Sequence, residues 1–478
     1  MKNKRYSAVL FLTAALTAFS ACGGPTLSSS STEEESSQGY VMERETMPEY
    51  LEGEASEKFI VGMWVGIPEY KSILDEYDRV TGQTAWTDAE LKEQYTWIKE
   101  AGFTLASTPN GSFSKDHVIR LLESAEEVGI EQLVWDAELN GVLLNTSLSE
   151  DEALSRARRI LLEYKDYPSF YGNMITDEPN TGEFAALKVA AERYKKLLPD
   201  KMFYLNLFPV GATTAQLGCG TYKEYLSEYE KLGLDYVCYD YYPLVRGTGT
   251  STKLTDSFLY NMQLCREMPS APEVWTFLQA MGFGNRKEPD CVEDCRIQVN
   301  CSLAYGMKAI QWFCYYSPSY GGAENFMPAI IALDGKKTEK YEYVKTANND
   351  AHAFEHVYTN FEWQRVMSFI GSENTKGENS AFNYLDTDNT HLRVDSFAST
   401  EDMLVGVFKD GQGRDGFMLA NYDLPSSKKT NKVEIKFNHC TKIVYFVNGV
   451  RKTAEAADGK LTLELKAGNG AFVLPLYL

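Results

Sequence analysis

Histidine, basic residues and phosphate-binding glycine loops are scarce in this sequence, and each shortage argues against a class of function. Only 5 of the 478 residues are histidine. They lie on predicted helices or in the C-terminal region, so neither a histidine metal site nor a Ser–His mechanism is expected. Lys and Arg total 47 against 67 Asp and Glu, and the net charge of −20 argues against nucleic acid as a partner. No G-x-G-x-x-G follows the first predicted strand, where Gly62 and Gly66 are isolated, so a dinucleotide-binding fold is disfavoured.

The first 21 residues have the pattern of a bacterial signal peptide. A basic start, residues 2–5, precedes an apolar segment, residues 9–19, which is too short to span a bilayer. The segment ends in Phe19-Ser20-Ala21-Cys22, which resembles a bacterial lipobox with Phe19 where leucine is usual. The resemblance implies an extracytoplasmic lipoprotein, anchored to the bacterial cell membrane through Cys22. An ordinary secreted protein and an uncleaved anchor are the alternatives.

Composition divides the rest of the chain into three parts. Residues 22–53 are rich in Gly, Ser and Glu and bury too little apolar surface to fold, which predicts a flexible tether. Residues 54–360 alternate between strand-like and helical patterns. Residues 361–478 contain short strand patterns with hairpin signals at Asn448-Gly449 and Asp458-Gly459, which predict an all-β sandwich. We expect this sandwich to pack on the preceding domain or to bind glycan weakly.

Eight short apolar segments predict the strands of a (β/α)8 TIM barrel in the middle part. Helix signals lie between them: Thr87 begins a capping box, and Ser114 precedes a helix that Gly129 ends. Eight alternations over about 300 residues fit the barrel, with a doubly wound open sheet as the alternative. The segments are residues 59–65, 103–107, 131–136, 170–177, 202–206, 235–240, 273–279 and 307–315.

Nine cysteines are present, of which Cys22 is assigned to the lipid. Among the other eight, Cys291, Cys295 and Cys301 are spaced closely enough to suggest a metal site, but no histidine accompanies them. We expect buried free thiols, with one disulfide as the alternative.

The carboxyl ends of the predicted strands are where a barrel of this kind places its chemistry. These ends carry carboxylates, amides and aromatic rings. Sugar chemistry uses this combination, because one acid protonates the leaving oxygen, a second carboxylate stabilises an oxocarbenium-like transition state, and aromatic faces stack on sugar rings. No cofactor and no metal are expected. The candidate site residues are Trp64, Trp135, Asp136, Asp177, Glu178, Asn206, Asp240, Tyr242, Gln279, Trp312 and Tyr315.

A family resemblance rests on the end of the fourth predicted strand. Asp177-Glu178-Pro179 is similar to the Asn-Glu-Pro of clan A glycoside hydrolases, in which the glutamate is the general acid/base. Residues 97–103, Asp240-Tyr241-Tyr242-Pro243 and Gln311-Trp312-Phe313 resemble segments of gut-bacterial lipoproteins with a glycosidase-like barrel and a β-sandwich. The resemblance covers the barrel and implies that Glu178 is the catalytic acid.

The seventh predicted strand departs from the clan A pattern. It ends in Gln279, which is neutral and cannot attack, where clan A places its nucleophilic glutamate. Asp240 on the sixth strand is the preferred second catalytic group, because barrels resembling the α-galactosidase clan use acids on strands four and six. Asp136, Glu138 and Glu324 are the alternatives, as is a site with no second carboxylate.

Alternation along a strand limits which neighbours can share one face. Asp177 and Glu178 are adjacent, so in a regular strand only one of them would face the barrel mouth. We expect Asp177 to hydrogen-bond a sugar hydroxyl or a neighbouring side chain, with capping of the following helix as the alternative. Trp64, Trp135, Trp312 and Tyr315 are expected to bind the sugar, with core packing as their alternative. Asp136, Asn206, Tyr242 and Gln279 are expected to contact substrate.

Two functions follow from these patterns. The first is a surface-anchored glycoside hydrolase acting on an oligo- or polysaccharide, and the acidic chain argues mildly against polyuronides and sulfated glycans. The second is a non-catalytic glycan-binding lipoprotein with a degenerate barrel, which the neutral Gln279 favours. Carboxyl groups about 5–5.5 Å apart would imply retention of configuration, and about 6.5–9.5 Å would imply inversion.

Overall fold

A computed structural model of the chain describes residues 42–55, 57–109, 113–247, 252–320, 323–374, 379–385, 388–456 and 458–478. The predicted signal peptide, Cys22 and most of the predicted tether lie outside these residues. Residues Glu43–Leu478 form one compact unit. Within the part of the chain described, no helix is both long enough and apolar enough to cross a membrane.

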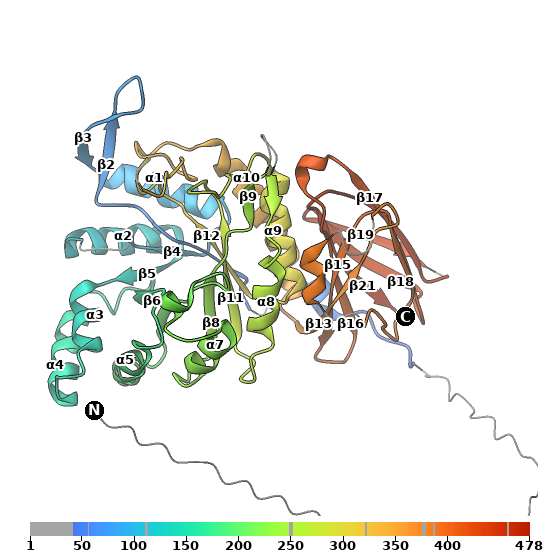
Figure 1. Cartoon of the computed structure of the whole chain (residues 1–478), viewed down its shortest axis with the longest axis horizontal. Coiled ribbons are helices and arrows are strands. Elements are labelled where there is room, and N and C mark those ends of the chain that lie inside the picture. The colour runs from blue at the N-terminus through green and yellow to red at the C-terminus, as the bar shows by residue number, and fades with distance from the viewer. Residues whose placement is uncertain are drawn as a thin grey trace, which may run out of the picture. The chain divides into compact units, whose positions relative to one another are not determined.

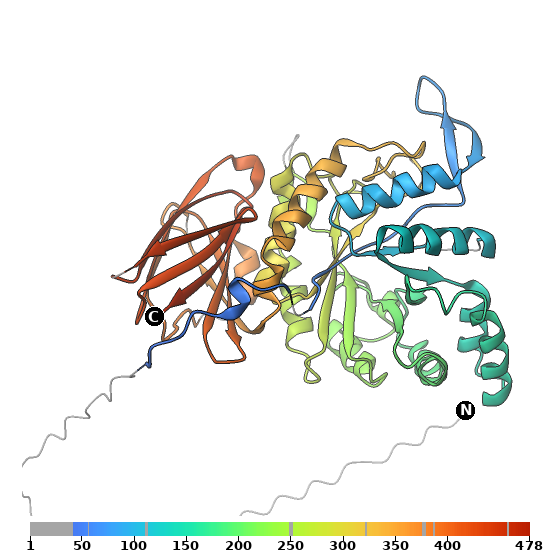
Figure 2. The same ribbon diagram turned by 180° about the vertical axis from the view of Figure 1, so that it is seen from behind.

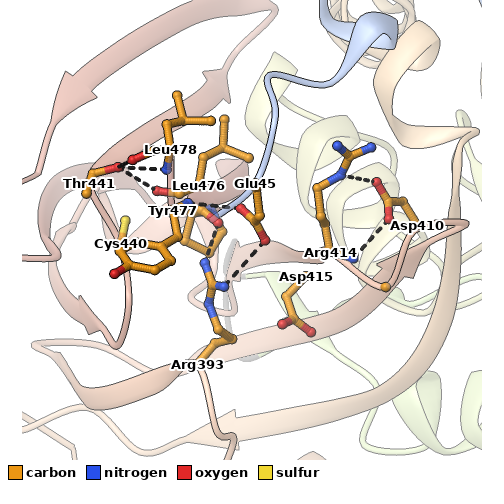
Figure 3. A network of polar contacts seen from close by, with 12 residues as sticks. Glu45, Arg393, Asp410, Arg414, Asp415, Cys440, Thr441, Leu476, Tyr477 and Leu478 are labelled. Atoms are coloured by element: carbon orange, nitrogen blue, oxygen red, sulfur yellow. Dashed lines mark hydrogen bonds and ion pairs between the residues drawn. The ribbon is translucent and has the colours of Figure 1, made fainter. Parts of the chain in front are cut away.

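Residues 43–52, which composition assigns to the tether, lie against the C-terminal part of the chain. Leu51, in the short helix η1 (Glu49–Leu51), is buried at 1% exposure. The backbone N–H of Glu45 donates to Tyr477 O at 2.6 Å, and the Glu45 carboxylate lies 3.5 Å from the buried Arg393 guanidinium (Figure 3). These long-range contacts order the segment, so fixed structure begins before the boundary predicted at residue 53.

Eight parallel strands form the centre of the α/β part, and each falls within or on one of the eight predicted segments. They bury apolar side chains in near-continuous runs, which is why a single sequence reveals them. The strands are β1 (Ile60–Met63), β4 (Leu105–Ser107), β5 (Glu131–Trp135), β6 (Phe170–Asp177), β7 (Met202–Asn206), β8 (Tyr236–Asp240), β11 (Glu273–Gln279) and β12 (Ala309–Phe313).

The eight strands are divided between two four-stranded sheets. One has the order β4-β5-β6-β7 and the other β1-β12-β11-β8. The sheets meet where Thr104 N donates to Val61 O at 3.0 Å, and again at a parallel bridge between Leu207 and Tyr239. The ladder is interrupted at these two seams among the described residues, so the arrangement is a mixed α/β fold with parallel sheets rather than one closed hydrogen-bonded barrel.

Helices lie outside the strands, as α1 to α5 show most clearly (Figure 2). Thr87 forms the predicted capping box at α1, and Ser114 and Gly129 bound α2 as expected. The helices are α1 (Asp88–Glu100), α2 (Lys115–Val128), α3 (Ala137–Leu144), α4 (Glu150–Leu161), α5 (Phe184–Leu197), α6 (Thr214–Leu217), α7 (Tyr222–Glu230), α8 (Phe258–Arg266), α9 (Val292–Ala304), α10 (Glu339–His352) and α11 (Glu355–Tyr358).

Two antiparallel hairpins are inserted into the α/β part. The first, β2 (Tyr70–Leu74) with β3 (Val80–Ala85), follows β1 and extends away from the neighbouring helices (Figure 1). The second, β9 (Leu244–Arg246) with β10 (Thr252–Leu254), follows β8. Both hairpins come after the carboxyl ends of parallel strands, so they belong to the loops on that side.

After α11 the chain changes to antiparallel sheets, next to the change predicted at residue 360. A six-stranded sheet has the order β13-β15-β16-β21-β18-β19, and a three-stranded sheet has the order β14-β17-β20. The strands are β13 (Phe361–Phe369), β14 (Val394–Ser399), β15 (Met403–Asp410), β16 (Asp415–Asn421), β17 (Thr430–Phe437), β18 (Lys442–Val447), β19 (Val450–Glu455), β20 (Lys460–Lys466) and β21 (Gly470–Leu476); the short 3-10 helices are η2 (Ser380–Tyr384) and η3 (Pro425–Ser427).

The six-stranded sheet is buried on both faces at its centre. Along β15, Val405 and Val407 pack with residues of the three-stranded sheet, whereas Leu404 and Phe408 join the core of the α/β part. Gly406 lies so close to α9 that a Cβ there would be 2.2 Å from Ala304 O. The α/β part and the β-sheet part therefore share one apolar core, as the prediction of packing on the preceding domain expects.

All eight cysteines from residue 219 onward are free thiols, and six of them are buried.

Candidate active site

The end of β6 departs from regular strand geometry, and this changes where its two acids lie. The pairing of β6 with β7 shifts register between Met174 and Thr176. Glu178 has a positive φ of 45°, and its N–H donates to Asn206 O at 2.8 Å. Asp177 and Glu178 consequently line the same cleft. The expectation for a regular strand, that only one of them faces the mouth, does not apply here because the register shift breaks the alternation.

Asn206 joins the acids of strands β6 and β8. Its Nδ2 donates to Asp177 Oδ1 at 3.1 Å and to Asp240 Oδ1 at 3.3 Å. Asp240 also interacts electrostatically with Glu178, which lines the same cleft. Three carboxyl groups from two strands therefore meet around one amide, and Asp240 lies deepest among them at 8% exposure.

Crowding of these acids favours their protonated forms. Burial raises the pKa of Glu178 to about 7, and the charge of Asp177 adds to the effect. Burial and the two neighbouring acids raise the pKa of Asp240 well above its usual value. Asp177 remains accessible to water inside the cleft, yet the surrounding protein partly desolvates it and raises its pKa to about 6. Like charges so close together favour retention of a proton by the pair, and the deeper Asp240 holds it more tightly.

Aromatic rings form the walls of this cleft, which has a volume of about 190 Å³. Tyr242 packs edge-on against Phe283, with ring centroids 5.2 Å apart, and lies 5.2 Å from Phe313. Trp64 packs against Phe277 at 5.5 Å. Acids and aromatic rings at the carboxyl ends of parallel strands are what the sequence predicts. The lining residues are Trp64, Asp177, Glu178, Asn206, Asp240, Tyr242, Phe277, Phe283, Phe313, Glu324 and Phe326.

A buried polar network fixes Asn206 from below. Cys238 Sγ donates to Asn206 Oδ1 at 3.4 Å, and Gln311 Nε2 lies 3.1 Å from the same sulfur. Tyr204 Oη donates to Gln311 Oε1 at 3.0 Å. With its oxygen held in this way, the Asn206 amide presents its N–H groups to the two aspartates.

The structure places Trp312 and Tyr315 away from the cleft. Trp312 is fully buried, and its Nε1 donates to Asn348 Oδ1 on α10 at 2.8 Å. Tyr315 is also fully buried, and its hydroxyl lies 3.4 Å from Gln94 O. Neither ring can stack on a sugar here, so both predicted platforms are wrong. Phe313, one residue after Trp312, points to the opposite face of β12 and lines the cleft instead.

Gln279 is fully buried and committed to the backbone of neighbouring loops. Its Oε1 accepts from Leu244 N at 3.0 Å, and its Nε2 donates to Lys287 O at 2.6 Å. The predicted contact with substrate is therefore wrong for this side chain. It fixes the loops that follow β8 and β11.

Trp135 and Asp136 line a different cavity, of about 180 Å³, at the end of β5. Asp136 caps α3 by accepting from Leu139 N at 3.0 Å, and it accepts from Tyr164 Oη at 3.1 Å. Glu138 lines the same cavity and lies 3.7 Å from Lys115. These two acids are separate from the carboxyl cluster, whereas the third alternative, Glu324, lies at the rim of the main cleft.

Four phenylalanines of the cleft are absent from the sequence-based list: Phe277, Phe283, Phe313 and Phe326. Strand alternation places Phe277 on the same strand face as Trp275, and Phe313 on the same face as Gln311. These two phenylalanines could therefore have been predicted. Phe283 and Phe326 lie in loops, where no periodic signal exists. Within the described segments no group of three or more His, Cys, Asp or Glu is arranged to hold a metal ion.

Comparison with known proteins identifies the fold of this arrangement. No protein-family model matches the chain, and no curated protein matches its sequence. An α-amylase from Anoxybacillus superposes with a TM-score of 0.51 at 12% identity, covering 87% of this chain and 98% of the amylase. A glycoside hydrolase family 5 protein from Bacteroides vulgatus superposes with a TM-score of 0.50 at 12% identity, covering 87% of this chain and 95% of that protein. The chain has a glycoside-hydrolase-like fold.

Proposed function

We propose that the protein is a glycoside hydrolase that cleaves O-glycosidic bonds of an oligo- or polysaccharide with the carboxyl groups of Glu178 and Asp240. The observation that carries the proposal is this pair of interacting carboxyl groups, set at the carboxyl ends of β6 and β8 in an aromatic-walled cleft. Similarity of the fold to glycoside hydrolases supports it, although that fold alone would not fix a function.

A pair that shares one proton can supply both groups that glycoside cleavage needs. One carboxyl delivers the proton to the leaving oxygen, and the other offers negative charge to the oxocarbenium-like centre. Burial and the two neighbouring acids favour Asp240 as the holder of the proton. Glu178, which is less buried, then supplies the carboxylate. This assignment reverses the roles that Asp177-Glu178-Pro179 implies by resemblance.

The chemistry of the lining favours neutral or basic sugars. Four carboxyl groups line the cleft, from Asp177, Glu178, Asp240 and Glu324, and no lysine or arginine is among the described lining residues. Uronic acid or sulfate groups would be repelled there. The aromatic walls, including Tyr242 and Trp64, present flat faces to sugar rings.

A screen for reducing-sugar release from polysaccharides and aryl glycosides tests the proposal. We expect wild type to be active on at least one neutral substrate, and Glu178→Gln and Asp240→Asn each to lose about a thousandfold in rate on the polysaccharides. Glu455→Gln, whose side chain is 82% exposed on β19, is the control and should retain full activity. Full activity in Glu178→Gln or Asp240→Asn would contradict the assignment.

Glycan binding without cleavage is the second candidate function. The end of β11 favours it, because Gln279 stands there as a neutral side chain where clan A glycoside hydrolases place a nucleophilic glutamate. Gln279, held by backbone groups, offers no third carboxylate. Saturable binding of a neutral oligosaccharide by calorimetry, with no turnover of any substrate, would select this candidate.

We further propose that the chain is a lipoprotein anchored outside the cytoplasmic membrane through Cys22, as the signal pattern of residues 1–21 indicates. Radiolabelled palmitate incorporation by wild type, and its absence in Cys22→Ala, would test this.

A further inference from the structure

Another cavity lies at the opposite ends of the parallel strands from the carboxyl cluster. It has a volume of about 510 Å³, against about 190 Å³ for the carboxyl cleft. Its walls include Tyr171 near the start of β6, Phe203 on β7, Tyr236 on β8 and Trp275 on β11, and one side is closed by α5. The proposed reaction does not use any of these residues.

A packed layer of rings separates the cavity from the carboxyl cleft. Tyr204 is fully buried between them, with its ring centroid 6.3 Å from that of Trp64 in the cleft and 6.2 Å from that of Trp275 in the cavity. Tyr236 stacks on Tyr204 at 6.3 Å from the cavity side. The cavity is therefore a separate site and not the far end of the cleft.

Trp275 and Tyr236 are only 2% and 7% exposed, so they form the floor of the cavity, whereas the half-buried Tyr171 presents ring surface to it. Trp275 Nε1 donates to Glu273 Oε1 at 2.7 Å. Tyr236 Oη donates to Phe203 O at 2.9 Å. A ligand that enters the cavity meets ring surface and aliphatic side chains along these walls.

Polar groups without protein partners surround those walls. Among the described residues, the side chains of Glu192, Lys195 and Asp235 have no ion pair or hydrogen bond, although each lines the cavity. The hydroxyl of Tyr171 likewise has none, and burial raises its pKa to about 12, so it stays protonated and able to donate. Donors and acceptors are thus both available, and their charges are of mixed sign.

We propose that this cavity is a second, non-catalytic binding site for a neutral saccharide of one or two rings. A sugar has an apolar C–H face for aromatic walls and hydroxyl groups that both donate and accept, which matches free groups of both kinds. The volume lies within the range of about 300–1,000 Å³ that small-molecule sites occupy. The mixed charges of Lys195, Glu192 and Asp235 do not favour a strongly charged ligand of either sign. The inference stands independently of the proposed hydrolase activity.

Calorimetric titration of the full chain with cellobiose, maltose and mannobiose tests the inference. We expect saturable binding of at least one disaccharide, with affinity reduced about tenfold in Tyr171→Ala. The double substitution Glu192→Gln with Lys195→Gln changes two exposed side chains, so it should also weaken binding without affecting folding. Glu455→Gln, an exposed substitution on β19, is the control and should leave this binding unchanged, whereas Tyr242→Ala reports any binding in the carboxyl cleft.

Two results would overturn the inference. One is the absence of saturable binding for all three disaccharides up to about 10 mM, where even weak sites become occupied. The other is binding that Tyr242→Ala abolishes and that Tyr171→Ala and the double variant leave intact, which would place all binding in the carboxyl cleft. Hydrolysis rates measured in parallel keep a failure of this site distinct from a failure of the proposed reaction.

Discussion

The carboxyl groups of Glu178 and Asp240 line one cleft and interact electrostatically, so the pair favours retaining at least one proton in this arrangement. Asn206 holds Asp240 from the side by donating to its Oδ1 at 3.3 Å. The pair is thus positioned by strands β6, β7 and β8 together, and its protonation links stability and activity to pH.

Stability should fall as the pH rises toward neutrality. Folding raises the pKa of Glu178 from 4.5 to about 7, so the folded state binds the proton more tightly than the unfolded chain does. The resulting stabilisation is fully present below about pH 4.5 and is lost as the pH passes about 7. In denaturant titrations at pH 4.5 and pH 8, Glu178→Gln should gain about 2 kcal/mol relative to wild type at the higher pH. An unchanged difference at the two pH values, matching Glu455→Gln, would contradict this expectation.

Activity should change in the opposite direction. If Asp240 holds the proton, the pair has its one carboxylate only after Glu178 ionises, near pH 7. The profile of kcat/KM against pH should therefore rise between pH 5 and pH 8 by about tenfold or more. A profile that falls across pH 7 would instead assign the donated proton to Glu178.

Trp312 should matter for stability and not for substrate. In Trp312→Phe the buried Asn348 Oδ1 loses its indole donor, which should cost about 1–3 kcal/mol in the free energy of unfolding. KM should be unaffected at temperatures where the variant is folded. Phe313→Ala, one residue along β12, should show the reverse pattern, with raised KM because it removes a wall of the cleft. Raised KM in Trp312→Phe would restore the original prediction for that ring.

The segment before β1 should contribute to folding. Leu51 is buried at 1% exposure, so Leu51→Ala should lower the free energy of unfolding by about 2–4 kcal/mol. Met47→Ala, in the same segment but 40% exposed, is the control and should change it by less than about 0.5 kcal/mol. Equal and small effects of the two substitutions, measured by denaturant unfolding, would mean that the segment behaves as the tether that composition predicts.

Sequence patterns locate the strands well, because buried parallel strands are short runs of apolar residues between helix signals. β6, β7 and β11 coincide with predicted segments at both ends. The carboxyl pair could be predicted for the same reason, because Glu178 and Asp240 each stand at the end of a correctly predicted strand. Whether the eight strands would close into one ladder was beyond these patterns, because closure depends on pairing at the seams near Thr104 and Leu207.

The errors concern which face a side chain occupies. Trp312 and Phe313 are neighbours on β12 and point to opposite faces of the strand. An error of one residue in the predicted alternation therefore places the core residue in the cleft and the cleft residue in the core. The register shift before Thr176 and the positive φ of Glu178 bring two adjacent acids together, and neither has a sequence signal. Gln279 is satisfied by loop backbone that is distant in sequence, such as Leu244. All of these depend on tertiary contacts that a local pattern does not contain.

The most direct measurement compares two substrate types in the two carboxyl variants. Initial rates would be taken on dinitrophenyl glycosides, whose leaving group needs no proton, and on the corresponding oligosaccharides, whose leaving group does. We predict that Glu178→Gln loses activity on both types, whereas Asp240→Asn loses it on the oligosaccharides and retains at least about a tenth of it on the dinitrophenyl substrates. Wild-type rates in both variants on both substrate types would contradict the claim that this carboxyl pair performs the cleavage.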